Sequence, residues 1–195
     1  MPSSRSATSI DPRSPFVLDT RELGRRPGSM RRVQRSAPAP ADWALELVRV
    51  PDGAEVELDL RLEAVMEGVL VSGSVHAPLA AECGRCLEPV ETTLETDVLE
   101  LYAYDPANAD DDVSVLEGDL IDLRPVLRDA IVLAMPINPV CDDGCEGLCV
   151  TCGTRWADLP PDHAHDELDP RWAKLSALRS PESASSDPAS PEIGR

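Results

Sequence analysis

The chain has 195 residues, a formal net charge of −18 at pH 7 and only 3% aromatic residues, so its core must consist mainly of Leu, Val, Ile and Ala. This size suits one compact domain with tails, or two small domains, and not a large enzyme. No run of about 18 apolar residues occurs and the N-terminal sequence MPSSRSATSI has no apolar segment, so we predict neither a membrane span nor a signal peptide.

Composition divides the chain into five predicted parts. Residues 1–15 and 180–195 are rich in Ser, Pro and Ala without apolar periodicity, which indicates disordered tails. Between the tails we expect a basic arm and linker at 16–41, an antiparallel sheet plus helix at 42–140, and a zinc-binding Cys/His lobe at 141–179. The arm begins with a candidate strand and carries the candidate RNA- or partner-binding residues Arg21, Arg25, Arg26, Arg31, Arg32 and Arg35.

Residues 43–104 have the pattern of long antiparallel strands. In 54–66 apolar residues alternate with charged ones, as in a strand that buries one face and exposes the other. Residues 67–68, Glu-Gly, are typical of a hairpin turn, and further strands follow at 69–82 and 90–104. This arrangement predicts an open sheet or a small barrel with one wet face.

Residues 122–134 predict the principal helix. Asp122 is a suitable cap, Pro125 is tolerated in the first turn, and apolar side chains recur on one helical face: Leu123, Leu127, Ala130, Ile131 and Ala134. A second, short helix is expected at 170–178.

Three closely spaced cysteine pairs precede two histidines: Cys83 and Cys86, Cys141 and Cys145, Cys149 and Cys152, then His163 and His165. We expect a cytoplasmic protein, in which thiols stay reduced and clustered cysteines hold a metal more often than a disulfide. Two thiolates at these spacings converge readily on a tetrahedral ion, with Zn–S bonds of about 2.3 Å. Six cysteines and two histidines provide two four-ligand sets, so we predict one or two structural zinc ions.

The most economical pairing groups the first four cysteines around one ion and the last two cysteines with the two histidines around the other. The crossed pairing stays open, as do a redox CxxC pair, buried thiols and a solvated DHAH loop. His76, alone in a predicted strand, is expected on the surface or in the core and not as a ligand. The predicted fold is therefore α+β, an antiparallel β-sheet or small barrel-like core with one main helix and a C-terminal zinc-knuckle lobe.

The sequence predicts no catalytic site. A thiol nucleophile needs a neighbouring base, and every cysteine is already assigned to a metal. The segment GRRPGSM lacks the Lys-Ser/Thr ending of a phosphate-binding loop. We therefore expect a protein that is not an enzyme and has no small-molecule substrate.

Several segments, in order, resemble the bacterial YceD-like family, the large ribosomal RNA subunit accumulation proteins: CGRCLEPV, IDLRPVLRDAIVLAMPINPVC, CEGLCVTCG and DPRWAKLSAL. The segment LDTRELGRRPGSM is similar to the N-terminal part of actinobacterial members, and the resemblance covers residues 16–178. It implies a role in synthesis, processing or stability of 23S rRNA and in assembly of the pre-50S particle, with an association with ribosomal protein L32. It provides no catalytic residue, and many relatives have a Cys-x-Cys pair where this chain has His163 and His165.

The charge distribution leaves the kind of partner open. Residues 1–41 carry a charge of +5, so the remainder carries −23 and should repel RNA phosphates. The arginine-rich arm could follow an RNA backbone, or it could lie against the protein's own acidic surface. Alternatively, the acidic body could act as a chaperone for a basic ribosomal protein such as L32, and a thiol-disulfide switch is a third hypothesis.

Overall fold

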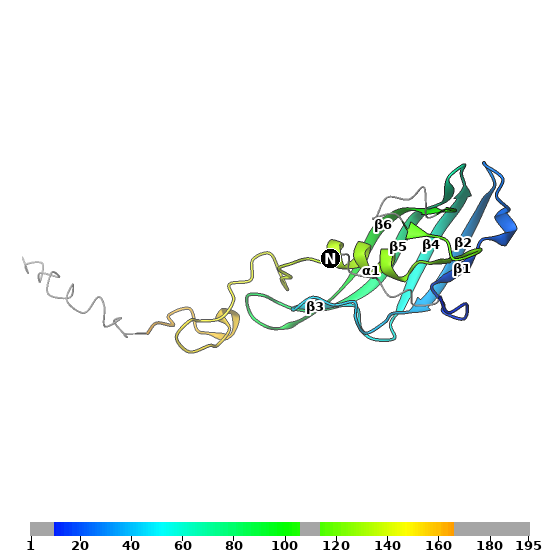
Figure 1. The fold of residues 1–195 in the computed structure, drawn as a ribbon. Helices are drawn as coiled ribbons and strands as arrows, with labels where there is room; N and C mark the ends of the chain where they lie inside the picture. The colour runs from blue at the N-terminus through cyan, green and yellow to red at the C-terminus, as the bar shows by residue number, and fades with distance from the viewer. Residues whose placement is uncertain (1–9, 106–113, 166–195) are drawn as a thin grey trace, which may run out of the picture.

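The computed structural model describes residues 10–105 and 114–165 (Figure 1). The tail predicted at 180–195, most of the tail predicted at 1–15 and the helix predicted at 170–178 lie outside the described residues. Among the residues described, no helix is long and apolar enough to cross a membrane.

The main element of the described chain is one open sheet with the strand order β2-β4-β5-β6-β7. The strands are β2 (Met30–Pro38), β4 (Glu55–Ala64), β5 (Gly68–Glu82), β6 (Pro89–Ala103) and β7 (Ser114–Val115), and the short β3 (Val48–Arg49) also pairs with β5. Neighbours are antiparallel except for β6 and β7, which are parallel. The sequence predicted either an open sheet or a small barrel, and the structure contains the open sheet.

The predicted alternation is realised in β4, where Val56, Leu58, Leu60 and Leu62 are buried and the residues between them face solvent. The register between β5 and β6 runs without interruption from Gly68 opposite Ala103 to Glu82 opposite Pro89. These two long strands extend beyond the rest of the sheet and end in the hairpin that carries the first cysteine pair (Figure 1).

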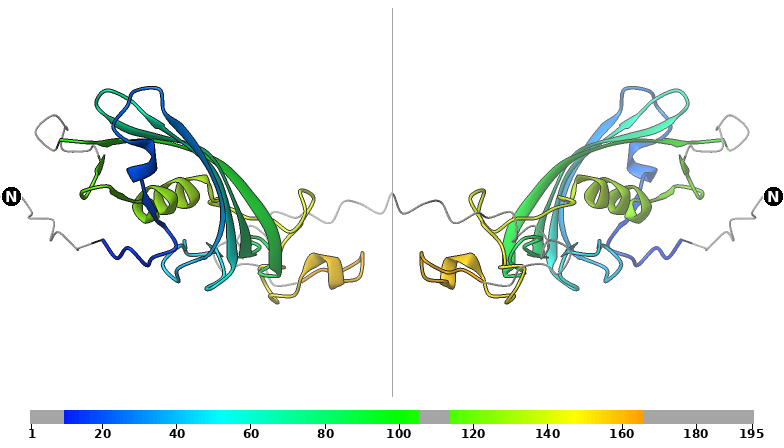
Figure 2. Two further views of the ribbon diagram at one scale, coloured as in Figure 1. Left: turned by 90° about the vertical axis from the view of Figure 1, so that its right-hand side faces the viewer. Right: turned by 90° about the vertical axis from the view of Figure 1, so that its left-hand side faces the viewer.

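One face of the sheet is covered by α1 (Arg124–Ala134), as both views in Figure 2 show. The helix begins two residues later than predicted, and the Asp122 carboxylate accepts a hydrogen bond from the Arg124 N–H at 2.9 Å. Leu127 and Ile131 of α1 are fully buried against the sheet. A small two-stranded sheet of β1 (Val17–Asp19) and β8 (Leu120–Asp122) brings the start of the described chain to the same side.

The structure corrects the arm and linker predicted at 16–41. Residues Met30–Pro38 form β2, which pairs with β4 along its whole length, and η1 (Arg21–Leu23) is a single helical turn. Val33 and Ala37 of β2 are buried, so this segment also has the two-residue period of a strand. Five polar or charged residues in β2 obscure that period in the sequence.

The hydrophobic core ends before the cysteine-rich lobe. The buried cluster runs from Phe16 to Met135 and is centred on Trp43 and the β4, β5 and α1 side chains. No residue of 136–165 belongs to it. The lobe, which contains the short helix η3 (Trp156–Asp158), must therefore be held by something other than apolar packing.

Candidate metal centres

The first cysteine pair lies in the turn between β5 and β6. The Cys83 N–H donates to the Glu88 carbonyl at 2.8 Å, and the Leu87 N–H donates to the Cys83 carbonyl at 2.9 Å. The turn closes through Leu87, which has a positive φ of 62°. These bonds fold the hairpin tip into a knuckle, with the two cysteines buried within it.

The second pair reaches this knuckle from the segment after α1. Pro136 and Pro139 stop the helix, and the Gly84 N–H donates to the Pro139 carbonyl at 2.8 Å. The Arg85 guanidinium donates to the carbonyls of Asp143, at 3.1 Å, and Cys145, at 2.9 Å. The two segments are far apart in sequence. They are joined here by hydrogen bonds to backbone carbonyls as well as by their cysteines.

We call Cys83, Cys86, Cys141 and Cys145 the sheet centre. Their four sulfur atoms lie within 4.8 Å of one another. The Sγ–Sγ distance is 3.9 Å between Cys83 and Cys145 and 3.6 Å between Cys86 and Cys141. Zn–S bonds of about 2.3 Å require tetrahedral edges of about 3.8 Å, so both distances suit a common metal ion.

The thiols of the sheet centre do not titrate alike. Backbone hydrogen bonding from Cys86, assisted by Arg85 and Cys141, lowers the pKa of the Cys83 thiol to about 6. The side chain of Cys86, followed by that of Cys145, raises the pKa of Cys141 to about 12. The Cys83 thiol thus ionises readily, whereas the Cys141 thiol resists ionisation because other cysteine side chains surround it. All four thiols can be ionised together only if a bound cation balances their negative charge.

We call Cys149, Cys152, His163 and His165 the terminal centre. Their ligand atoms also lie within 4.8 Å of one another, with Cys152 Sγ and His163 Nε2 3.7 Å apart. The Gly153 N–H donates to the Cys149 carbonyl and the Cys149 N–H donates to the Thr154 carbonyl, both at 2.8 Å, which forms a second knuckle. The two imidazole rings meet edge to face at 4.5 Å.

Hydrogen bonding favours the ionised forms of two terminal-centre ligands. Hydrogen bonding from the Thr154 side chain and backbone lowers the pKa of the Cys152 thiol to about 6. The Cys152 and then the Cys149 side chain raise the pKa of His165. A cation bound between these groups would replace the imidazolium proton as the partner of the thiolates.

Arg155 and Glu88, which the sequence did not single out, link the terminal centre to the sheet hairpin. Arg155 forms an ion pair with Glu88 of the sheet hairpin at 2.8 Å and another with Asp158 at 2.7 Å. Gly147 has a φ of +80°, and a Cβ there would lie 2.9 Å from the Arg85 carbonyl oxygen. A sequence signal for Arg85 exists, because it lies between Cys83 and Cys86, but Arg155 and Glu88 carry none.

The structure groups the predicted ligands in the economical pairing and not in the crossed one. Both groups are arranged suitably for a metal, and all six cysteines are free of disulfides. His76 belongs to neither group. It is exposed on β5 with its Nε2 3.6 Å from a Glu95 carboxylate oxygen, as expected of a surface residue.

The six candidate binding arginines do not form one cationic surface. Arg21 pairs with Asp19, and Arg31 pairs with Glu22 at 3.2 Å. Arg25 lies over the Tyr104 ring, 4.9 Å from its centroid. Arg35 donates a hydrogen bond to the Pro15 carbonyl at 2.6 Å, and Arg32 forms an ion pair with Asp59. Arg26 has no ion-pair partner among the described residues.

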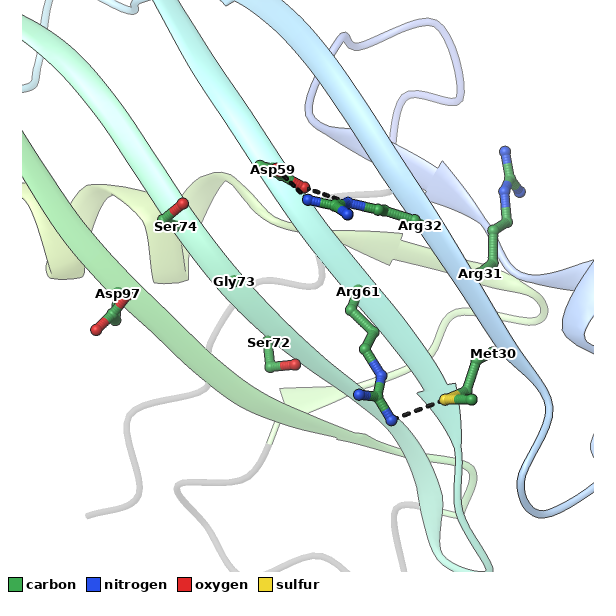
Figure 3. A pocket seen from close by; sticks show the side chains of 9 residues that line it. All are labelled: Met30, Arg31, Arg32, Asp59, Arg61, Ser72, Gly73, Ser74 and Asp97. Carbon is green, nitrogen blue, oxygen red and sulfur yellow. Dashed lines mark hydrogen bonds and ion pairs between the residues drawn. The ribbon is translucent and has the colours of Figure 1, made fainter.

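Arg32 lines an open hollow of about 590 Å³ on the outer face of the sheet (Figure 3). Its guanidinium reaches from β2 to both Asp59 carboxylate oxygens, at 2.9 and 2.6 Å, and lowers the pKa of Asp59 to about 2. Arg61, on the same face, pairs with Glu63 at 2.7 Å. The cations of the hollow are thus already paired with the protein's own carboxylates.

Comparisons with known proteins agree with the ordered cysteine motifs. Residues 71–179 match the family described as large ribosomal RNA subunit accumulation protein YceD. An uncharacterized protein of Mycobacterium tuberculosis is 43% identical over 175 residues, which cover 87% of this chain and 84% of that protein. No solved structure matches.

More distant relatives include YlbN of Bacillus subtilis, which is 28% identical over 62% of this chain and 69% of its own length. A chloroplastic protein of Arabidopsis thaliana, named large ribosomal RNA subunit accumulation protein YCED homolog 1, is 24% identical over 66% of this chain and 50% of its own length. The matched segment of the family contains both centres and more than half of the chain. The chain therefore belongs to the YceD family.

Proposed function

We propose that the protein is a non-enzymatic cytoplasmic factor for accumulation of 23S rRNA, acting in its synthesis, processing or stability and in assembly of the large ribosomal subunit. Membership of the YceD family carries the proposal, because the match includes α1 and every ligand of both centres. The name of the Arabidopsis thaliana relative supports the same role.

The two centres hold structural zinc. Tetrahedral sets of thiolate and imidazole ligands are those that zinc prefers, and the sulfur separations suit Zn–S bonds. The Cys83, Cys86, Cys141 and Cys145 thiolates would bind one ion, and Cys149, Cys152, His163 and His165 the other. Bound zinc would supply the cross-link that holds the lobe on the sheet, because 136–165 adds nothing to the apolar core.

The function is non-enzymatic because four protein ligands leave no coordination position for a reacting water molecule. Within the described residues, the exposed His76 contacts only a carboxylate on the neighbouring strand, and the imidazoles of the terminal centre are engaged with cysteines. The role is therefore one of binding, with the zinc ions maintaining shape.

Depletion of the protein in its own host tests this function. The ratio of 23S to 16S rRNA should fall, and re-expression of the wild-type chain should restore it. A matched control variant, Glu67→Gln, changes an exposed carboxylate in the turn between β4 and β5, at the other end of β5 from the sheet centre, and should restore the ratio equally well. An unchanged ratio after complete depletion would refute the proposed function.

A second candidate function is that of an acidic module that binds a basic ribosomal protein such as L32 without contacting RNA. Two observations favour it: the net charge of −18, and the pairing of most candidate arginines with the protein's own groups. Oppositely charged surfaces attract one another and accelerate encounter.

Crosslinking in cells, followed by identification of RNA and protein partners, separates the two candidates. Deleting residues 1–41 is unsuitable, because it would remove β1 and β2 from the fold. Crosslinks from RNA to Arg25 or Arg26 would favour direct RNA contact. Salt-sensitive recovery of L32 without such crosslinks would favour the protein-binding module.

A further inference from the structure

The outer edge of β6 is the longest open edge of the sheet. β6 pairs with β5 at all of its positions, whereas on the other side only Tyr102 and Ala103 pair with β7. Within residues 10–105 and 114–165, no other segment forms a backbone hydrogen bond with 90–101. One side of this stretch therefore presents free N–H and C=O groups.

This edge lacks proline, lysine and bulges, three of the devices that commonly protect a sheet from adding another strand. Residues 90–101 contain no proline and no lysine, and their continuous register with β5 leaves no bulge. The opposite edge differs, because the arginines of β2 reach across to the β1 side. Arg31 donates to the Asp19 carbonyl at 3.2 Å, and Arg35 to that of Pro15.

The side chains of β6 indicate what kind of strand would fit. Glu91, Glu95 and Asp97 are exposed on the outer face, and none of them has an arginine or lysine partner among the described residues. On the opposite face, Leu94 packs against the core and Val98 belongs to it. A strand added here should carry cations on its outer face and apolar side chains on its inner face.

We propose that the free edge of β6, from Val90 to Leu101, binds an extended basic segment of a partner protein as an additional strand. Backbone hydrogen bonds provide affinity, and alternate side chains provide specificity. Lysine or arginine of the partner pairs across the strands with Glu91, Glu95 and Asp97. RNA phosphates would instead face these carboxylates, which excludes RNA from the same edge.

The proposed docking at this edge rests on the second candidate function. It adds which surface of the protein binds the partner and that the partner binds as an extended strand. The probe is a fluorescein-labelled nonapeptide in which arginine alternates with valine, titrated against the full-length protein at low salt. Fluorescence anisotropy should report binding, and hydrogen exchange should slow, when the peptide is added, at those amides of 90–101 that are not hydrogen-bonded to β5. A peptide of the same sequence with every second amide N-methylated keeps its charge and should not protect this segment.

Removing the carboxylates tests the charge pairing. The variant E91Q/E95Q/D97N should bind the peptide about tenfold more weakly, because three cross-strand ion pairs are lost. A matched control, E46Q/D52N/D119N, removes three exposed carboxylates elsewhere and should bind within about twofold of wild type. Far-UV circular dichroism of both variants should match that of the wild-type protein.

Three results would overturn the proposal. The N-methylated peptide could bind and protect 90–101 as well as its parent, which would mean unspecific charge attraction. The amides of 90–101 that are not hydrogen-bonded to β5 could exchange slowly in the free protein, which would mean that the chain itself or a second copy covers the edge. An RNA oligonucleotide could protect the same amides. Each result would leave intact the fall in the 23S to 16S ratio on depletion, which tests the proposed function separately.

Discussion

Substitution Cys145→Ser should detach the lobe from the sheet without unfolding the sheet itself. Cys145 contributes one of four sulfur atoms to the sheet centre, 3.9 Å from Cys83 Sγ, and a serine hydroxyl is a poor zinc ligand. The hydrophobic core ends at Met135 and contains no residue of the lobe. Loss of this zinc ion should therefore disorder the segment around the sheet centre and leave the sheet folded.

The magnitude follows from the contacts that remain. Three hydrogen bonds, from Gly84 and Arg85, join the hairpin to the segment 139–145, and they contribute about 1 kcal/mol each. Ordering the eight residues 140–147 costs about 8–16 kcal/mol of conformational entropy. Binding of structural zinc contributes about 10–16 kcal/mol, so the ion decides whether this segment is ordered.

Metal analysis and amide hydrogen exchange measure the two consequences. Zinc content should fall from two ions per chain to one, because the terminal centre has its own four ligands. Exchange should accelerate in 136–147, while β4 and β5 keep their protection. The melting temperature of the sheet should change by no more than a few degrees.

Leu127→Ala provides the matched control. It removes a fully buried side chain of α1 and should cost about 3 kcal/mol of unfolding free energy, with both zinc ions retained. The reasoning would be refuted if Cys145→Ser kept two zinc ions, or if it unfolded the sheet as strongly as Leu127→Ala does.

Three further predictions concern single side chains. His163→Ala should reduce zinc from two ions to one and leave exchange at the sheet hairpin unchanged, as metal analysis would reveal; two retained ions would contradict the ligand assignment. Gly147→Ala should accelerate zinc loss to a chelator, because its Cβ would crowd the Arg85 carbonyl and its φ is +80°. Burial raises the pKa of Tyr102, whose hydroxyl donates to the Asp122 carbonyl at 3.0 Å, so the neutral phenol is favoured in the folded state. Stability should therefore fall as pH rises above about 10, where only the unfolded state loses the proton, and Tyr102→Phe should reduce that loss in denaturation curves recorded between pH 8 and 11.

The fold features that the sequence predicted are those with an uninterrupted local pattern. Strand β4 alternates cleanly between apolar and charged residues, and α1 has an apolar stripe with proline in its first turn. The grouping of the donor side chains was also predictable, because four pairs of soft donors divide most simply into two groups of four by nearness in the chain, and those groups lie together in the structure. The supporting contacts of Arg155 with Glu88 depend on tertiary placement and leave no pattern in the sequence.

Strand β2 shows why other features of the fold could not be predicted from the sequence. Its sequence, MRRVQRSAP, contains only two residues that are buried in the structure, Val33 and Ala37. A strand at the edge of a sheet is held largely by backbone hydrogen bonds to one neighbour, and these bonds are nearly independent of side-chain type. The arginines that predicted a basic arm instead form ion pairs and hydrogen bonds that tie β2 to β1 and β4.

That arrangement bears on which partner the protein meets. If Arg32 were to bind an RNA phosphate, it would first have to leave Asp59, and an RNA strand would then lie beside an unpaired carboxylate. Arg31 and Arg35 would likewise have to release the β1 side of the fold. A basic protein segment at β6 requires no such exchange, because Glu91 and Asp97 have no cationic partner among the described residues. Among the described residues, the unpaired charges at this edge are therefore negative, and they suit the basic partner of the second candidate function better than an RNA phosphate.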